Sequence, residues 1–235
     1  MDLDIKSNLE NIRARIARAA EKAGRLPESV RLVAAGKGVT PERLKEAINF
    51  GIEIIGENRV QEALTKMKET GLDSTRSISW HMIGRLQRNK VRDVVGRFEL
   101  IHSVDSCPLA EEINKWAGKS GISQKVLLEV NVGGEGTKCG IPPDMVLDLT
   151  KKMAGYKNIS IMGLMTIPPV SIDPELSRGF FRLLKQMAGA IDKEGIDRVK
   201  MAELSMGMSD DFEVAVEEGA TFVRIGRAIF GPRRG

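Results

Sequence analysis

The segment Arg31–Lys37, RLVAAGK in one-letter code, decides the fold. It is a short apolar run that ends in a lysine, and the helix breakers Gly38 and Pro41 follow it. This profile is typical of a strand buried in a parallel sheet. Burial disfavours the charged form of a lysine and lowers its pKa, which yields a nucleophilic amine able to form a Schiff base. The alternative is a Lys37 side chain that reaches solvent from the strand end.

The composition is that of an ordinary globular protein. The 235 residues, 42% hydrophobic and 29% charged, suffice for one large domain with a full core. The net charge of +4 is dispersed, without the basic stripe and interleaved aromatic residues of a nucleic-acid-binding surface. We therefore expect no nucleic-acid partner, and the pI of about 9.1 is only a weak indication of anionic ligands.

The cysteines and histidines predict neither a disulfide nor a metal site. Cys107 and Cys139 are isolated, which fits a reducing cytoplasm, and His81 and His102 lack the spacing of a zinc motif. The chain is charged from Asp2 onward and has no apolar run of membrane-spanning length. We therefore expect a cytoplasmic protein without a signal peptide, a metal ion or a membrane partner.

Apolar runs and helical periodicities alternate along the chain after a predicted amphipathic helix over 4–22. The predicted strands cover 31–37, 52–56, 79–83, 100–104, 125–132, 159–167, 201–206 and 221–225. The helices that follow the first seven cover 41–48, 60–69, 86–95, 109–117, 142–153, 175–193 and 211–218, and a short Ala-Ile-Phe segment over 228–230 follows the eighth strand. Eight such units predict a single α/β domain over 1–235, a (β/α)₈ TIM-type barrel with an extra N-terminal helix. A doubly wound open sheet is the rival fold, but the count of eight without a break in composition favours a closed barrel.

In such a barrel, the functional site lies where the strands end. The predicted strand ends carry polar residues, namely Lys37, Asn58, His81, Ser103, Asn131, Thr166, Ser205 and Arg224. The sequence assigns no role to His81. Glu57 is either a base or, as we prefer, a carboxylate that caps the next helix.

The loops after the last two strands are the usual phosphate site of a barrel enzyme. Here they contain Ser205 and Gly207, and then Gly226 and Arg227. Either glycine alone is better explained by relief of strain in a turn. Together, on adjacent strands and beside Ser205, they favour a phosphate site, because glycine lets the backbone approach an anion.

A phosphate site opposite a strand-end lysine suits pyridoxal 5′-phosphate. The lysine forms the Schiff base, the backbone holds the phosphate, and a third group meets the pyridine nitrogen. Arg224 is the candidate for this third group, although an ion pair with Glu203 or Glu129 explains its position equally well. The glycine-rich loop over 133–136 matches neither a P-loop nor a dinucleotide fingerprint, and we interpret it as a mobile loop over the site.

Long motifs make the chain recognisable. They lie at 56–63 (GENRVQEA), 80–84 (WHMIG), 86–90 (LQRNK), 101–105 (IHSVD), 129–135 (EVNVGGE), 138–140 (KCG), 163–166 (GLMT), 204–211 (LSMGMSDD) and 219–231. Over nearly its full length the chain resembles the pyridoxal phosphate homeostasis proteins. The resemblance implies a fold-type III barrel, like the N-terminal domain of alanine racemase, that carries pyridoxal phosphate on Lys37 as an internal aldimine. It also implies contacts to the phosphate from Ser205, Gly226 and Arg227 (through backbone N–H), to the pyridine nitrogen from Arg224, and to the ring from Asn58 and Met165.

Two departures from the family pattern are visible. Gly36 and Gly38 flank the lysine where Ser, Ala or Thr is expected, which predicts a less rigidly packed lysine. Arg227 occupies a position where a small hydroxyl residue is common, so a cationic contact to phosphate replaces a hydroxyl contact.

The resemblance implies a carrier or regulator of the cofactor pool that is not a turnover enzyme. The alternative is a racemase or decarboxylase of the same barrel family, but those enzymes complete their site with an added domain. Their second base is usually a tyrosine, whereas the only tyrosine here, Tyr156, precedes the sixth strand. We expect a monomer whose partners are pyridoxal phosphate and, as recipients, apo-enzymes that depend on it.

Overall fold

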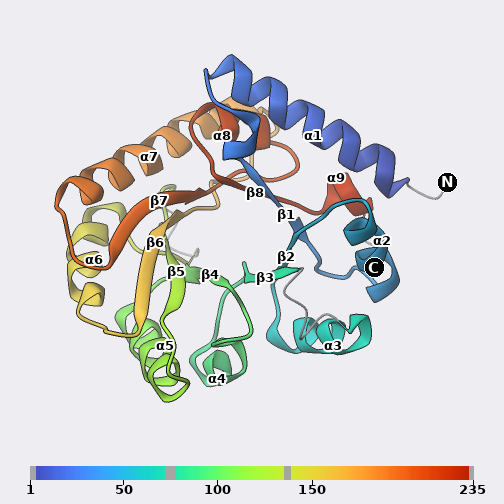
Figure 1. Ribbon diagram of the computed structural model, residues 1–235. Coiled ribbons are helices and arrows are strands. Elements are labelled where there is room, and N and C mark those ends of the chain that lie inside the picture. The colour runs from blue at the N-terminus through green and yellow to red at the C-terminus, as the bar shows by residue number, and fades with distance from the viewer. Residues whose placement is uncertain (1–3, 72–77, 135–138, 233–235) are drawn as a thin grey trace.

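The computed structural model describes residues 4–71, 78–134 and 139–232. Eight parallel strands pair in chain order, and β8 pairs with β1, which closes the barrel and excludes the open sheet. Figure 1 shows the strands in the middle and the helices around them. The strands are β1 (Arg31–Ala35), β2 (Ile54–Glu57), β3 (Ser79–Met82), β4 (Leu100–Val104), β5 (Gln124–Glu129), β6 (Ile159–Met165), β7 (Val199–Ser205) and β8 (Phe222–Ile225).

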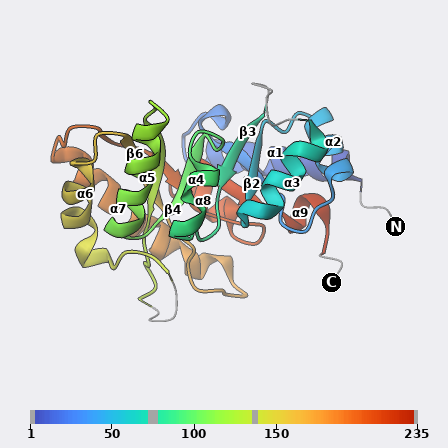
Figure 2. The same cartoon turned by 90° about the horizontal axis from the view of Figure 1, so that it is seen from below.

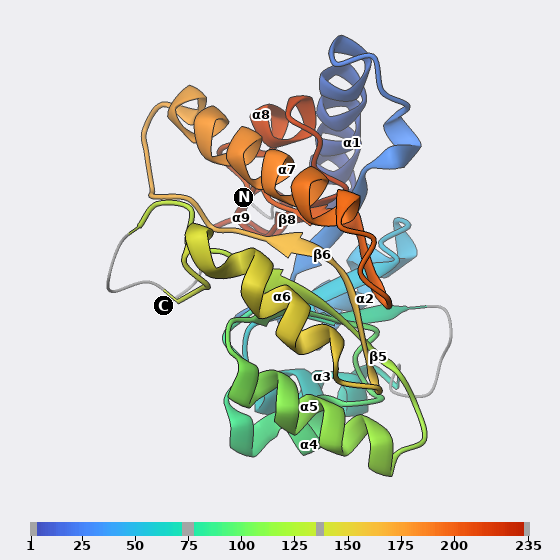
Figure 3. The ribbon, with the colours of Figure 1, turned by 90° about the vertical axis from the view of Figure 1, so that its left-hand side faces the viewer.

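The helices lie outside the strands, as Figures 1 and 2 show. Figure 3 shows α6 and α7 on the side of the barrel that carries β6. The helices are α1 (Ile5–Lys22), α2 (Pro41–Asn49), α3 (Val60–Thr70), α4 (Val91–Val94), α5 (Cys107–Lys119), α6 (Val146–Ala154), α7 (Arg178–Lys193), α8 (Phe212–Glu217) and α9 (Arg227–Phe230), and the 3₁₀ turns are η1 (Pro27–Ser29), η2 (Arg88–Lys90), η3 (Pro143–Met145) and η4 (Pro174–Ser177).

Helix α1 is the predicted additional helix. The side chain of Asp4 caps it by accepting a hydrogen bond from the backbone N–H of Lys6 at 3.0 Å. Its apolar stripe, which includes Ile5, Leu9 and Ile12, is buried. Helix α1 packs against α8 and α9, so the start and the end of the barrel are joined by helices as well as by strands (Figure 1).

The apolar side chains form two separate cores. The larger core lies between the strands and the helices that cover them. The smaller one consists of inward-pointing side chains inside the barrel, namely Val33, Ile83, Leu100, Leu127, Met165 and Phe222. Both faces of the strands are therefore buried, which is why the strands read as apolar runs without alternation.

The predicted element bounds differ from the observed ones mainly where loops begin. The predicted helix over 86–95 is only η2 and α4, because the preceding loop is fixed by a hydrogen bond from Ser103 Oγ to the carbonyl oxygen of Gly84 at 2.6 Å. No helix of the described residues is long and apolar enough to cross a membrane. Within the same residues, Cys107 and Cys139 are free thiols, and no group of three or more His, Cys, Asp or Glu could hold a metal ion.

Candidate cofactor site

A cavity of about 1030 Å³ opens at the carboxyl ends of the strands. Five of the predicted site residues line it: Lys37, Asn58, Arg224, Gly226 and Arg227. The structure therefore brings residues from β1, β2 and β8 together, as expected from their positions at the strand ends. The other two predicted residues, Ser205 and Met165, are buried below and do not line this cavity.

Lys37 follows β1 by two residues and is half-buried at the cavity wall. Within residues 4–71, 78–134 and 139–232, its ammonium group has no hydrogen-bond or ion-pair partner. The preceding residue, Gly36, is buried, and a Cβ atom there would lie 2.3 Å from Glu57 Oε1. The backbone is therefore closely packed at Gly36, whereas nothing lies within 4 Å of a Cβ atom at Gly38, and the less rigid packing of the lysine stays a prediction.

Glu57 forms a buried ion pair instead of capping a helix. Lys66 Nζ on α3 donates to Glu57 Oε1 at 2.8 Å, to Glu62 Oε1 at 2.7 Å and to the Gly36 carbonyl oxygen at 2.5 Å. Burial raises the pKa of the Glu57 carboxyl to about 7, although Lys66 opposes this shift. Lys66 thus ties β2 and α3 to the backbone that carries Lys37.

Arg224 lies at the base of the cavity and is 4% exposed. Its Nη1 donates to Ser205 Oγ at 2.6 Å, and its Nη2 donates to the Thr166 carbonyl oxygen at 2.9 Å. Burial lowers the pKa of the guanidinium to about 10, so the group remains a cation at neutral pH. Arg224 does not form the alternative ion pairs, because Glu203 pairs with Arg31 and no carboxylate of the described residues lies within 4 Å of Arg224.

The loops after β7 and β8 form another part of the wall. Gly226 lines the cavity and precedes α9, whose first N–H groups have no intrahelical acceptor. The side chain of Arg227 pairs with Asp210 across the two loops. Gly207 has a φ of +89°, and a Cβ atom there would lie 2.5 Å from Ala215 Cβ, so its role is close packing.

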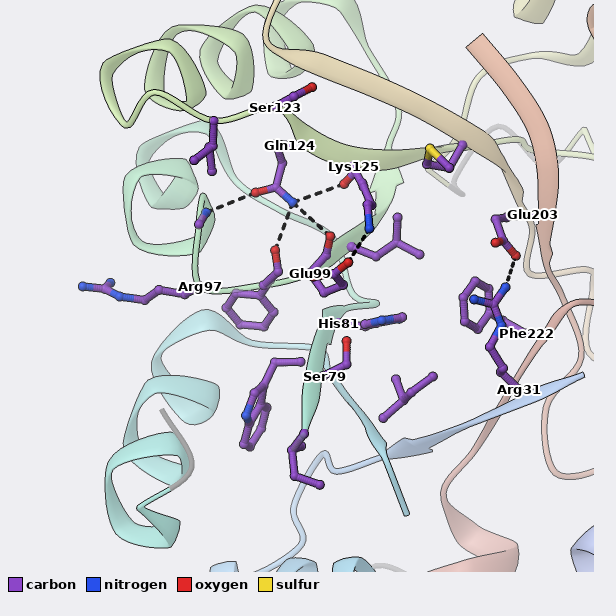
Figure 4. Close-up of a pocket in the computed structure, with 18 residues that line it drawn as sticks. Arg31, Ser79, His81, Arg97, Glu99, Ser123, Gln124, Lys125, Glu203 and Phe222 are labelled. Carbon is purple, nitrogen blue, oxygen red and sulfur yellow. Dashed lines mark hydrogen bonds and ion pairs between the residues drawn. The ribbon is translucent and has the colours of Figure 1, made fainter. Parts of the chain in front are cut away.

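Ser205, His102 and His81 form a hydrogen-bonded line inside the barrel. Ser205 Oγ lies 2.8 Å from His102 Nδ1, and His102 Nε2 lies 2.9 Å from His81 Nδ1. His81 was predicted at the carboxyl ends of the strands, and this placement was wrong. Its ring points into a second cavity at the opposite end of the barrel (Figure 4).

This second cavity, of about 880 Å³, is lined by the first residues of several strands, among them Arg31, Ser79 and Leu100. Four of its charged groups form two ion pairs. Figure 4 shows Arg31 paired with Glu203 and Lys125 paired with Glu99. Gln124 Nε2 donates to the carbonyl oxygens of three neighbouring residues. Arg97 also lines the cavity, and its side chain donates to the backbone carbonyl oxygen of Asp93 at 3.2 Å.

Three functional candidates were missed by the sequence interpretation or given no role, namely Lys66, His102 and His81. The signal for Lys66 is a lysine on the apolar side of a helix that follows a strand ending in glutamate. Of the remaining predictions, Tyr156 does precede β6 at its amino end. Of the glycine-rich loop predicted over 133–136, residues 135 and 136 lie outside the part of the chain that the structure describes.

The barrel has a lysine just after β1, and at the end of β8 it has an arginine two residues before a glycine. This combination of fold and strand-end residues fits one class of protein. The family model of the alanine racemase N-terminal domain matches residues 7–234. Within this class, the chain belongs to the family of the pyridoxal phosphate homeostasis proteins. The protein of that name from Aquifex aeolicus is 46% identical over 229 residues, which cover 96% of this chain and 97% of the relative.

Two solved structures have a similar fold. PipY of Synechococcus elongatus, solved with PLP (pyridoxal phosphate) bound, is 34% identical with a TM-score of 0.84 over 97% of this chain and 100% of PipY. An alanine racemase of Clostridium difficile is 16% identical with a TM-score of 0.72, which shows the fold alone. The match covers 98% of this chain but 57% of that racemase, so the racemase has a substantial part without a counterpart here.

Proposed function

We propose that this protein binds PLP in the cavity at the carboxyl ends of the strands and carries it without turning over amino acids. The observation that supports this most is that Lys37, Arg224 and Gly226 line one cavity. The names of the relatives and the PLP bound to PipY support the same ligand.

The residues of the cavity fit this cofactor. Bound PLP supplies an aldehyde, which condenses with a lysine amine to a Schiff base and releases water. The Lys37 amine has no competing partner among the described residues and faces the cavity. Toward the described residues, Arg224 donates two of its five N–H groups, and it can donate another to the pyridine nitrogen, which then stays unprotonated.

The other lining residues would hold the rest of the molecule. Gly226 and Arg227 offer backbone N–H groups to the phosphate at the start of α9. Asn58 would border the ring. Met165 packs inside the barrel in the same cluster as Ile83, which lines the cavity, so it would support the ring from below.

The cavity does not offer what racemisation needs. That reaction requires a base on each face of the substrate α-carbon, and Lys37 can serve only one face. The described residues that line the cavity include no tyrosine or histidine, and Tyr156 is at the amino end of β6. An arginine at the pyridine nitrogen also weakens the ring as an electron sink. These points favour a carrier over the racemase or decarboxylase alternative.

The attachment is tested by borohydride reduction of the PLP-loaded protein and peptide mapping. We expect a pyridoxyl group on the peptide that contains Lys37, and no fixed label in Lys37→Ala. Label on Lys66, the buried lysine behind Gly36, would contradict the assignment.

The carrier role is tested with two assays. The loaded protein is incubated with L- and D-amino acids while chirality and carbon dioxide release are followed, and we expect turnover far below about 1 s⁻¹. In the second assay, we expect activation of a PLP-dependent apo-enzyme by the loaded protein. Turnover near 1 s⁻¹ that Lys37→Ala abolishes would establish an enzyme instead. We also propose a monomer, and light scattering would measure its mass in solution.

A further inference from the structure

Four buried side chains form one continuous line from the cofactor cavity to the opposite end of the barrel. Arg224, Ser205, His102 and His81 are 4%, 0%, 0% and 2% exposed. The three contacts measure 2.6, 2.8 and 2.9 Å between donor and acceptor atoms. The ring of Phe222 packs against both imidazoles, with centroid distances of 5.4 and 5.5 Å, and holds them in place.

The direction of every hydrogen bond on this line follows from Arg224. A guanidinium can only donate, so Ser205 Oγ accepts from it. The Ser205 hydroxyl is fully buried, and its only other partner among the described residues is His102 Nδ1. Ser205 must therefore donate to an unprotonated Nδ1, since the hydroxyl proton would otherwise be buried without an acceptor.

The same argument determines which ring nitrogen carries the proton in each histidine. With Nδ1 accepting, the neutral His102 ring carries its proton on Nε2 and donates it to His81 Nδ1. The His81 proton is then also on Nε2, which points into the second cavity (Figure 4). Burial and the nearby cations Arg31, Lys125 and Arg224 lower the pKa of the two imidazoles, so both remain neutral.

We propose that Ser205, His102 and His81 are positioning residues that hold Arg224 in place for the cofactor, and that Ser205 is not a phosphate ligand. The proposal rests on the proposed function for its ligand. The hydroxyl of Ser205 donates its single proton in the hydrogen bond to His102 and accepts a hydrogen bond from Arg224. It therefore has no second proton with which to donate a hydrogen bond to a phosphate. The line thereby fixes the plane of the guanidinium of Arg224, which lines the cavity.

The first test compares PLP with pyridoxal, which lacks the phosphate, in wild type and Ser205→Ala. Loss of the acceptor frees Arg224, so we expect Ser205→Ala to weaken both ligands by the same factor, about tenfold for a lost bond to a charged group. A loss confined to PLP would make Ser205 a phosphate ligand and overturn the proposal. Wild-type protein that binds neither ligand would refute the proposed function instead.

The second test substitutes His102 in two ways. His102→Asn retains an acceptor close to the position of Nδ1, whereas His102→Leu removes it. We expect His102→Leu to weaken PLP and pyridoxal as Ser205→Ala does, and His102→Asn to stay within about threefold of wild type. Equal losses in both folded variants would mean that the histidine only fills space.

The third test needs no cofactor and remains decisive if His102→Leu fails to fold. The chain contains two histidines, so nitrogen-15 NMR of the histidine-labelled protein reports only His81 and His102. We expect both rings at pH 7 to be neutral with the proton on Nε2. A proton on Nδ1 of His102, or a charged ring at either position, would overturn the proposed line.

Discussion

Lys66 Nζ donates to the carbonyl oxygen of Gly36 at 2.5 Å, one residue before Lys37. A lysine that is 5% exposed thus fixes the backbone that presents the Schiff-base candidate. Its charge is balanced by Glu57 and Glu62, so the cavity wall rests on a buried ionic cluster.

Gly36→Ala should be much more harmful than Gly38→Ala. A Cβ atom at Gly36 would meet Glu57 Oε1 at 2.3 Å, and Glu57 cannot retreat without breaking its pair with Lys66. At Gly38 nothing lies within 4 Å, and only the φ of +73° costs about 1 kcal/mol. We expect Gly36→Ala to lower the free energy of unfolding by about 2–4 kcal/mol and to reduce PLP loading. Similar values for the two variants in chemical denaturation would contradict this.

Lys66→Met should be among the most destabilising changes on α3. Removing the ammonium leaves the fully buried Glu57 carboxylate without its cation, which costs about 3–5 kcal/mol. The matched control is Lys68→Met, on the exposed side of the same helix, where about 0.5 kcal/mol or less is expected. Urea unfolding of both variants measures the difference, and equal midpoints would show that the cluster is not stabilising.

Glu129→Gln should change how stability depends on pH. Burial, and then Asp105, raises the pKa of the Glu129 carboxyl to about 7. The folded protein therefore keeps a proton between pH 4.5 and 7 that the unfolded chain releases, and this stabilisation is lost as the pH rises through 7. Glutamine stays neutral, so the free energy of unfolding of wild type relative to Glu129→Gln should fall by up to about 3 kcal/mol from pH 4.5 to 7.5. Parallel pH curves would contradict the raised pKa.

Gly226→Val should abolish PLP binding while the barrel still folds. The branched side chain would occupy the space proposed for the phosphate, next to the start of α9. A Cβ atom at this position would lie 3.1 Å from the Ala35 carbonyl oxygen, so we expect some loss of stability. Thermal unfolding measures this loss. A folded Gly226→Val that binds PLP as wild type does would place the phosphate elsewhere.

The sequence predicted the barrel and the positions of the strand ends, because apolar runs report burial and their boundaries report where strands stop. Lys37, Arg224 and Gly226 line one cavity, as expected, since Lys37 and Gly226 follow such a run and Arg224 is the penultimate residue of one. His81 was misplaced because both faces of a barrel strand are apolar, so the sequence does not show which side chains point inward.

Contacts between distant segments could not be predicted. The pairing of Glu57 with Lys66 depends on how α3 folds back on β2, and the contact of His102 with Ser205 spans the barrel interior. Both pairs join residues whose spacing in the chain matches no motif, and only the register of the closed barrel brings the second pair together.

The packing of α1 against α8 and α9 also has a consequence for synthesis. Arg15 pairs with Glu213 at 2.7 Å, and Asn8 Nδ2 donates to the Ile229 carbonyl oxygen at 2.9 Å. Helix α1 leaves the ribosome before these partners, which follow it by on the order of 10–40 seconds at ~5–20 residues per second. During that interval its apolar stripe lacks the part of its native cover that α8 and α9 supply, so we expect chaperones to bind α1 on the nascent chain.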